Sequence, residues 1–223
     1  MNSVRVKSFI FSLLTLLTCG VSNAESGLYG KVLRPPAETE TASKVDRYRS
    51  RSSSDPTSKA ANCNCTPGLY SVITLTSDSL PLVIVPDTSP SISQKNAMFE
   101  PSVLAVPVGT TVEFPNLDPF FHNVFSYSKT KKFDLGRYPK GESQSVTFDK
   151  PGIVQIFCEI HYSMRAYVHV VTTPYAAVSN EQGEFFIPRV APGEYTLHVW
   201  QEKLPEITMS LSIADDSTFV EVE

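Results

Sequence analysis

Between Phe99 and Val171 the chain repeats one pattern, a short run of alternating apolar and polar residues followed by a turn containing Gly or Pro. Alternation with a period of two puts successive side chains on opposite faces of an extended backbone, as a half-buried strand requires. Several such strands at regular spacing, separated by residues such as Gly109 and Gly152, are typical of a Greek-key sandwich. The sequence therefore predicts an all-β fold.

The same pattern continues toward both ends of the chain. We predict strands at residues 27–34, 69–79, on both sides of a hairpin turn at Gly109 within 99–118, and at 120–128, 143–149, 152–158, 165–173, 184–188, 194–200 and 207–213. Residues 35–68 are polar, rich in Ser and almost free of large aliphatic side chains, which predicts a long disordered loop. Residues 129–142 are expected to be a connection between strands.

The first 24 residues have the pattern of a secretory signal peptide. A charged start with Arg5 and Lys7 precedes a short apolar run and a small-residue cleavage site after Ala24. The apolar run is too short for a permanent membrane span. Cys19 faintly resembles the lipidated cysteine of bacterial lipoproteins, but Thr18 fits that motif poorly, so we expect simple cleavage. The product is expected to be periplasmic or secreted, without a membrane span.

The charge of the chain argues against nucleic acid as a partner. The full sequence has 19 basic and 23 acidic side chains. Removal of the signal peptide takes away Arg5 and Lys7 and no acidic residue, which leaves 17 basic side chains and a net charge of −6. Phosphate backbones are bound by basic surfaces, which this composition does not favour. We expect a monomer that meets a protein partner.

The cysteines are informative because an exported protein meets an oxidising environment. After processing, Cys63, Cys65 and Cys158 remain, an odd number, so at least one thiol is free, intermolecular or bound to a metal. Cys63 and Cys65 could form a local disulfide, bind Cu(I) or link two chains, and the sequence leaves these possibilities open. A bond from either to Cys158 would remove the thiol that a metal needs.

The stretch FCEIHYSM, residues 157–164, holds three candidate metal ligands. Cys158 offers a thiol, His161 an imidazole and Met164 a thioether, a set of soft and borderline donors that suits copper. Copper sites that transfer electrons hold two imidazoles and one thiolate in a trigonal array, with a long axial bond to Met. The loop therefore needs a second imidazole from elsewhere in the chain.

Of the three remaining histidines, His122 is the best candidate for that imidazole. It lies beside a strand that follows the predicted hairpin. His169 and His198 each lie in the middle of an alternating strand, where a surface or hydrogen-bonded imidazole is the simpler interpretation. We therefore expect His122 and His161 to be the two histidine ligands.

The segment that carries these residues resembles the cupredoxins, the blue copper proteins that include plastocyanin, pseudoazurin and amicyanin. The resemblance rests on FEPSVLAVPVGTTVEFPNLD, HNV and FDKPGIVQIFCEIHYSM, and it covers roughly residues 99–171. Two residues separate Cys158 from His161, and two separate His161 from Met164, which is the short spacing of amicyanin. The resemblance implies one mononuclear type 1 copper held by His122 and His161 (equatorial nitrogens), Cys158 (thiolate) and Met164 (axial thioether).

The same resemblance gives Asn123 a role beside the metal. In the family, the backbone amide of the Asn after the first His typically donates to the thiolate, and such contacts orient ligands and tune the potential. Glu159 and Ile160 depart from the family, which usually has a small polar residue and Pro at these positions. A carboxylate so close to the thiolate should favour Cu(II) and lower the potential.

Cupredoxins exchange electrons through an apolar patch around the second histidine, and a similar patch is expected here. Pro119, Phe120, Phe121 and Tyr162 could form it, with Phe120 and Tyr162 as its expected centre. One of the two Phe side chains should lie in the core, because alternation points neighbours to opposite faces. A modest patch is sufficient, since redox encounters are small and transient.

The tail, residues 173–200, resembles the transthyretin-like or carboxypeptidase regulatory-like β-sandwich, whose first strands look like residues 27–34 and 69–77. We therefore expect a second small sandwich built from both ends of the chain, with the cupredoxin inserted into it, and two consecutive domains are the alternative. The expected parts are residues 25–85 (N-terminal strands with the loop 35–68), 86–172 (cupredoxin domain) and 173–223 (C-terminal strands of the second sandwich).

The predicted function is that of an exported blue copper protein that carries single electrons between redox partners. A periplasmic copper-binding or copper-delivery protein without redox cycling is the alternative, and a purely structural sandwich would bind no copper. We do not expect an enzyme, because no Ser, His and acid arrangement or zinc motif is evident and one mononuclear site lacks the further coppers of an oxidase.

Overall fold

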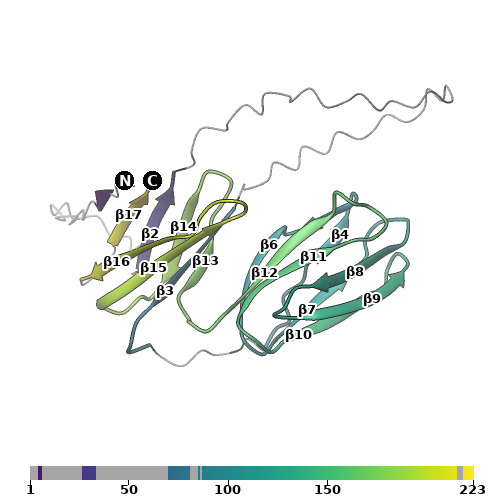
Figure 1. Cartoon of the computed structure of the whole chain (residues 1–223), viewed down its shortest axis with the longest axis horizontal. Helices are drawn as coiled ribbons and strands as arrows, with labels where there is room; N and C mark the ends of the chain where they lie inside the picture. Colours follow the sequence, from purple (N-terminus) through teal and green to yellow (C-terminus); the bar gives the residue numbers. More distant parts are fainter. Residues whose placement is uncertain (1–4, 7–26, 34–69, 81–84, 86, 215–217) are drawn as a thin grey trace, which may run out of the picture.

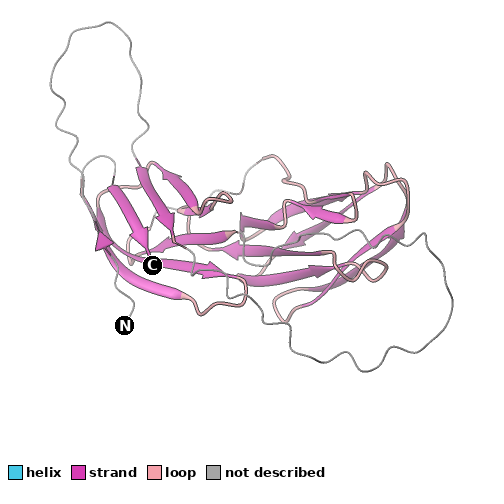
Figure 2. Cartoon of the chain, turned by 90° about the horizontal axis from the view of Figure 1, so that it is seen from above, coloured by secondary structure: helices cyan, strands magenta, loops and turns pink. Residues whose placement is uncertain are grey.

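The computed structural model describes residues 5–6, 27–33, 70–80, 85, 87–214 and 218–223. Within these residues the fold is all-β, which confirms the predicted class (Figure 2). In this described part of the chain, no helix has the length and apolar character needed to cross a bilayer. Cys63, Cys65, most of the predicted signal peptide and the predicted loop at 35–68 lie outside the described residues.

Nine strands, β4 to β12, form one sandwich (Figure 1). One of its layers is a five-stranded sheet in the order β6-β12-β11-β8-β9, and the other contains the pairs β10-β7 and β4-β5, which isolated bridges join. Strand β12 pairs parallel with β6 and antiparallel with β11. The strands are β4 (Ser93–Lys95), β5 (Met98–Glu100), β6 (Val103–Pro107), β7 (Thr110–Pro115), β8 (His122–Tyr127), β9 (Lys132–Tyr138), β10 (Ser143–Phe148), β11 (Gly152–Phe157) and β12 (Arg165–Val171).

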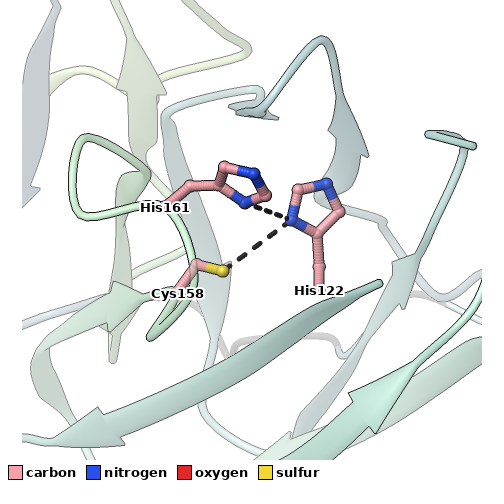
Figure 3. Close-up of side chains that lie close together, drawn as sticks. All are labelled: His122, Cys158 and His161. Carbon is pink, nitrogen blue, oxygen red and sulfur yellow. Dashed lines mark hydrogen bonds between the residues drawn. The ribbon is translucent and has the colours of Figure 1, made fainter. Parts of the chain in front are cut away.

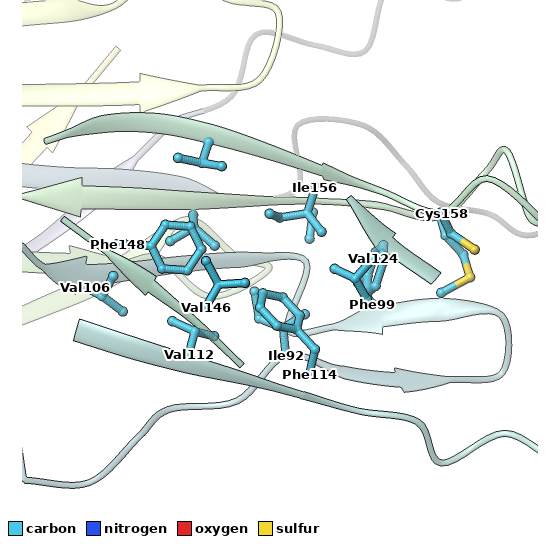
Figure 4. Packing of buried hydrophobic residues seen from close by; sticks show 14 of the residues in the cluster. Ile92, Phe99, Val106, Val112, Phe114, Val124, Val146, Phe148, Ile156 and Cys158 are labelled. Atoms are coloured by element: carbon cyan, nitrogen blue, oxygen red, sulfur yellow. The ribbon is translucent and has the colours of Figure 1, made fainter. Parts of the chain in front are cut away.

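The core of this sandwich follows from the alternation along its strands. In β11 the side chains of Val154 and Ile156 are fully buried, whereas Ile153 and Gln155, which alternate with them, are exposed. Each fully buried side chain of this size contributes about 1.5–3 kcal/mol through removal of apolar surface from water. Cys158 continues the inward series, and it lies at one end of the packed core, away from Val106 and Phe148 (Figure 4).

Strands from both ends of the chain form a second pair of sheets. Their orders are β1-β17-β2-β14 and β13-β3-β15-β16, and one core fills the space between them. The strands are β1 (Arg5–Val6), β2 (Gly27–Val32), β3 (Ser71–Thr76), β13 (Ala176–Val178), β14 (Glu184–Pro188), β15 (Gly193–Gln201), β16 (Ile207–Ile213) and β17 (Thr218–Val222). Residues 27–32 and 71–76 thus share sheets with the tail, while the exact domain bounds given above stay a prediction.

The two sandwiches meet along the outer face of β12. Tyr167 and His169 project from this face, and their rings lie 5.1 and 4.2 Å from the ring of Trp200 in β15. Arg165, at the start of β12, forms an ion pair of 3.6 Å with Glu202. The strand that leaves the Cys158 loop is therefore packed on one side by its own core and on the other by the second sandwich.

Two expectations about this region were wrong. The strands on either side of Gly109 do not form a hairpin, because β6 pairs with β12 whereas β7 pairs with β10. The Val108 amide donates to Val171 in the first sheet, and the Gly109 amide donates to Phe148 in the second. Gly109 has φ +91°, a conformation open to glycine, so the turn carries the chain from one sheet to the other.

Residues 129–142 contain strand β9 rather than being only a connection. Their density of charge hid it, because Lys132 and Asp134 point outward while Phe133 and Leu135 pack against the core. Since β9 is the edge of its sheet, outward charges are what protects it from pairing with another chain. The short strands β4, β13 and β17 were also not predicted, and the strand predicted from Phe99 to the Gly109 turn is divided into β5 and β6.

Candidate metal centre

The loop from Cys158 to Met164 joins two strands that pair up to its base, where Phe157 lies opposite Arg165. The Met164 amide donates to the carbonyl of His161 at 2.9 Å, and the Cys158 amide donates to the carbonyl of Met164 at 3.4 Å. These bonds close the loop into a tight turn. As a result Cys158 and Met164 are both buried, and His161 lies half-buried at the surface.

His122, at the start of β8, completes a group of three converging donors (Figure 3). Its Nδ1 lies 3.1 Å from Nδ1 of His161 and 3.7 Å from Sγ of Cys158. The three donor atoms lie within 4.8 Å of one another, and His122 is fully buried. Among the described residues this is the one group of His, Cys, Asp and Glu donors that meets this spacing.

The three side chains fit a first-row transition metal. Bonds of about 2.0–2.3 Å from nitrogen and sulfur to a common centre place the donors roughly 3–4 Å apart, as they are here. Burial lowers the pKa of His161 below its ordinary value, repulsion from His122 adds to this, and attraction by Asp118 opposes it. The imidazole is therefore favoured in its neutral form, which is the form that binds metals.

Met164 and Asn123 are near the group, but the structure tests neither predicted role. Met164 belongs to the buried core together with Cys158, so its axial position stays a prediction. The Asn123 side chain accepts a hydrogen bond of 2.7 Å from the Glu159 amide, and its amide nitrogen lies 3.4 Å from the Glu159 carboxylate. Asn123 thus fixes the first residue after Cys158, and its backbone bond to the thiolate stays a prediction.

The Glu159 carboxylate is not isolated beside Cys158. It forms an ion pair of 3.0 Å with Arg137 from the edge strand β9, and both side chains are more than half exposed. The guanidinium offsets part of the negative charge, which weakens the effect on the potential that we expected from Glu159 alone.

The sequence reasoning missed Asp118. Its Oδ2 lies 2.8 Å from Nε2 of His122, the ring nitrogen that faces away from Cys158. Burial by itself would raise the pKa of Asp118, but hydrogen bonds from the Ala97 amide, His122 and the Asn96 amide hold that pKa below its ordinary value. The only sequence signal was an acidic residue four positions before the histidine, and a loop position has no periodicity to mark it.

A frame of hydrogen bonds holds the segment that contains Asp118. The Asn116 side chain accepts from the Asp118 amide at 3.0 Å and donates to the carbonyls of Phe120 and Tyr138 at 2.9 and 3.0 Å. Asn116 itself is fully buried. The approach to His122 is therefore fixed by side-chain bonds rather than by a sheet.

Both Phe120 and Phe121 are exposed, so the expectation that one of them lies in the core was wrong. Strand alternation does not reach them, because β8 begins only at His122. The Phe120 ring lies 5.1 Å from the ring of His122 and 5.3 Å from that of His161. Tyr162 is 94% exposed on the adjoining loop.

The apolar surface around the group is wider than expected, because Leu117 and Ile160 are also exposed. Neither was predicted as part of the patch. We use the name "apolar rim" for the exposed residues Leu117, Pro119, Phe120, Phe121, Ile160 and Tyr162.

The other two histidines lie away from the group. His198 is hydrogen-bonded to Thr76 at 3.0 Å and to Glu206 at 3.2 Å, as expected for a strand histidine. His169 differs from that expectation, since it is 7% exposed and its Nε2 has no hydrogen-bond partner in the structure.

Comparison with family models agrees with this geometry. Residues 87–171 match the model of the copper binding proteins of the plastocyanin/azurin family. This segment is similar to a cupredoxin in sequence and fold, and we call it the cupredoxin domain. The ligand group lies within it, at the end of the core that Cys158 occupies. Residues 160–219 match a second model, domain II of polysaccharide lyase family 4, which covers most of the tail.

Solved structures give further likenesses to the cupredoxin domain. A copper-containing nitrite reductase from Thermus scotoductus is 29% identical over 41% of this chain, with a TM-score of 0.37, and the match spans a quarter of the reductase chain. A purple cupredoxin from Nitrosopumilus maritimus is 24% identical over 37% of this chain and 100% of its own, with a TM-score of 0.34. A reduced amicyanin variant is 26% identical over 44% of this chain and 99% of its own, with a TM-score of 0.36. A search of curated proteins gave no match.

Proposed function

We propose that this protein is an exported electron carrier with one type 1 copper, held by His122, Cys158 and His161 with Met164 as the axial ligand. The observation that carries the proposal is the meeting of Nδ1 of His122, Nδ1 of His161 and Sγ of Cys158 in a segment that matches the plastocyanin/azurin family. Copper bound there would supply reversible one-electron chemistry. The predicted signal peptide supports export.

The protein part of this function is to hold the donors still. His122 and Cys158 are buried in a packed core, and Met164 and Cys158 are tied to each other through the loop backbone. Since the donors already converge, little movement is needed when the charge at the centre changes. A fixed ligand geometry of this kind favours fast electron exchange over metal release.

The apolar rim is the proposed contact for a protein redox partner. Its Phe120 ring lies 5.3 Å from the ring of His161, which is half-buried, whereas His122, Cys158 and Met164 are buried. Phe120 packs against both histidine rings, so a partner seated on the rim would meet the ligands through one aromatic side chain. A patch of this size fits the small and transient interfaces of redox partners.

The test is to add Cu(II) to the purified apoprotein and record its visible spectrum. We expect an intense band from charge transfer between thiolate and copper, which Cys158→Ser removes. The matched control is His198→Gln, which removes a half-buried histidine outside the group and should keep the band. A colourless complex that passes copper to an acceptor would contradict electron transfer and favour copper delivery.

A further inference from the structure

Asp118 occupies a special place beside the ligand group, because it is the one carboxylate that contacts a candidate ligand side chain among the described residues. We infer that Asp118 is a positioning residue that holds His122 with its Nε2–H toward the carboxylate and its Nδ1 free for the metal, and that its negative charge lowers the potential of the centre. This inference rests on the proposed function, but one of its two tests, a measurement on the apoprotein, does not require copper.

The contact is short and shielded from water. Nε2 of His122 and Oδ2 of Asp118 are 2.8 Å apart, and their side chains are 0% and 6% exposed. The imidazole lies between the carboxylate on one side and the sulfur of Cys158 on the other. Charge-assisted hydrogen bonds in such surroundings are stronger than those at the surface, because water does not screen them.

A tight turn between β4 and β5 holds the carboxylate from its other side. The Asn96 amide donates to Oδ1 at 2.7 Å, and the Ala97 amide donates to Oδ2 at 2.9 Å. Both residues have positive φ, 55° and 54°. Asn adopts this conformation readily, whereas Ala is disfavoured there, so the turn keeps an unfavourable residue in a geometry that aims two amides at Asp118.

These donors determine which nitrogen of His122 carries the hydrogen. A carboxylate only accepts hydrogen bonds, and Oδ2 accepts from the Ala97 amide and faces Nε2 of His122. The Nε2 atom must therefore be the donor. In a neutral imidazole the other nitrogen then has a free lone pair, and that atom is Nδ1, which faces Cys158 and His161.

The same contact has an electrostatic consequence. A carboxylate bonded to a ligand imidazole makes the ring a better electron donor and places a negative charge near the metal. Both effects favour the more highly charged Cu(II) over Cu(I). The potential of the centre should therefore be lower than it would be with a neutral partner at this position.

The main variant is Asp118→Asn, which keeps the shape and replaces one oxygen by an NH₂ group. If the NH₂ group takes the place of Oδ2, it is a hydrogen-bond donor that faces Nε2 of His122. Nε2 then has to accept, and the ring hydrogen moves to Nδ1, the nitrogen that should bind the metal. If the NH₂ faces the Asn96 amide, two donors oppose each other at 2.7 Å. We expect copper affinity to fall roughly 10–100-fold, as for other partners of metal-bound histidines, and the potential to rise.

A control separates positioning from general damage. The tautomer, the copper affinity and the potential are compared with those of a control variant that leaves Asp118 and its hydrogen-bond partners intact. Asp149→Asn removes an exposed carboxylate that pairs with Lys131, and it should leave all three unchanged. If the wild-type protein binds copper and Asp118→Asn has the same copper affinity and potential, the inference is overturned.

A second measurement does not depend on copper. Nitrogen NMR of the imidazoles in the wild-type apoprotein should show His122 with its hydrogen on Nε2, and the hydrogen on Nδ1 would overturn the inference. This arm remains decisive if Asp118→Asn fails to fold. If the wild type has the Nε2–H tautomer but forms no coloured copper complex, the proposed function fails while the positioning role stands.

Discussion

Two histidines of the cupredoxin domain are buried, and their surroundings are opposite. His122 is fully buried, with Nε2 beside Asp118 and Nδ1 beside the Cys158 sulfur. His169 is 7% exposed, its Nε2 has no partner, and its ring lies 4.2 Å from that of Trp200. Burial removes both rings from water, but both ring nitrogens of His122 face polar partners, whereas Nε2 of His169 has no hydrogen-bond partner. If His122 binds copper as proposed, its hydrogen-bond partners, and not its burial, distinguish it from His169.

The pKa of His169 records this contrast. Burial lowers it to about 4, because the charged ring loses its hydration. At neutral pH His169 is therefore a neutral packing group between the two sandwiches. The following predictions test the contrast, beginning with the largest expected effect.

Replacement of His122 and replacement of His169 should have very different effects on copper affinity. His122→Gln removes a ligand and should lower copper affinity by more than the roughly 100-fold that loss of a ligand's hydrogen-bond partner costs. His169→Phe should leave the affinity within about twofold, because the side chain faces away from the ligand group. Competition with a chelator of known affinity measures both. Similar losses in the two variants would break the comparison.

The free energy of unfolding should decrease as the pH is lowered, because of His169. The unfolded chain binds the proton with a pKa of about 6.5 and the folded chain with a pKa of about 4, so the unfolded state binds more protons between these values. The contribution is fully present above about pH 6.5 and is lost as the pH falls to about 4. The loss amounts to about 3 kcal/mol in the free energy of unfolding.

The variant His169→Phe isolates this effect from the titration of carboxylates. Its free energy of unfolding, from urea titrations at several pH values, should fall less than that of the wild type between pH 6.5 and pH 4. Parallel pH profiles for the two proteins would show that His169 is not the group responsible.

Removal of Trp200 should uncover His169. Trp200 is the only tryptophan of the chain and is half-buried, so Trp200→Ala should lower the free energy of unfolding by about 1–3 kcal/mol, less than truncation in a full core. The exposed imidazole should then titrate closer to its ordinary value, which NMR can follow. A pKa of His169 that stays near 4 in this variant would mean that other groups cause its burial.

The smallest expected effect concerns the exposed pair of Arg137 and Glu159. Arg137→Gln should change the free energy of unfolding by less than about 1 kcal/mol, because both partners are exposed to solvent. It should also lower the potential of a bound copper slightly at low salt, since the Glu159 charge is then uncompensated, and added salt should remove the difference. The measurement is voltammetry at two salt concentrations. A higher potential in the variant would contradict this prediction.

Much of the fold followed from the sequence because alternation and turn residues are local signals. They located strands such as β11 and β15, and the alternating side chains Tyr195, Leu197 and Val199 of β15 are buried. Pairing depends on contacts between distant segments, which local patterns do not contain. That is why we predicted a hairpin at Gly109. The edge strand β9 was missed for a local reason, because its charged residues hide the alternation of Phe133 and Leu135.

The ligand group divides in the same way. Cys158, His161 and Met164 are neighbours in the sequence, and the chemistry of their side chains made them visible. His122 followed by elimination among few histidines, and the structure brings it to Cys158 and His161. Asp118 had no such signal, since its importance comes from a turn 21 and 22 residues earlier in the chain, whose two amides donate to it.

The pairing of β3 with β13 has a consequence for folding. Thr74 lies opposite Ala176, so about 100 residues, which include the whole cupredoxin domain, leave and rejoin one sheet at adjacent strands. While that domain is folded, its ends are held together and act as a short connection. If it unfolds, the second sandwich has to close a loop of that length, at a cost of roughly 2–3 kcal/mol relative to a short turn. A metal that stabilises one sandwich would therefore raise the melting temperature of the other.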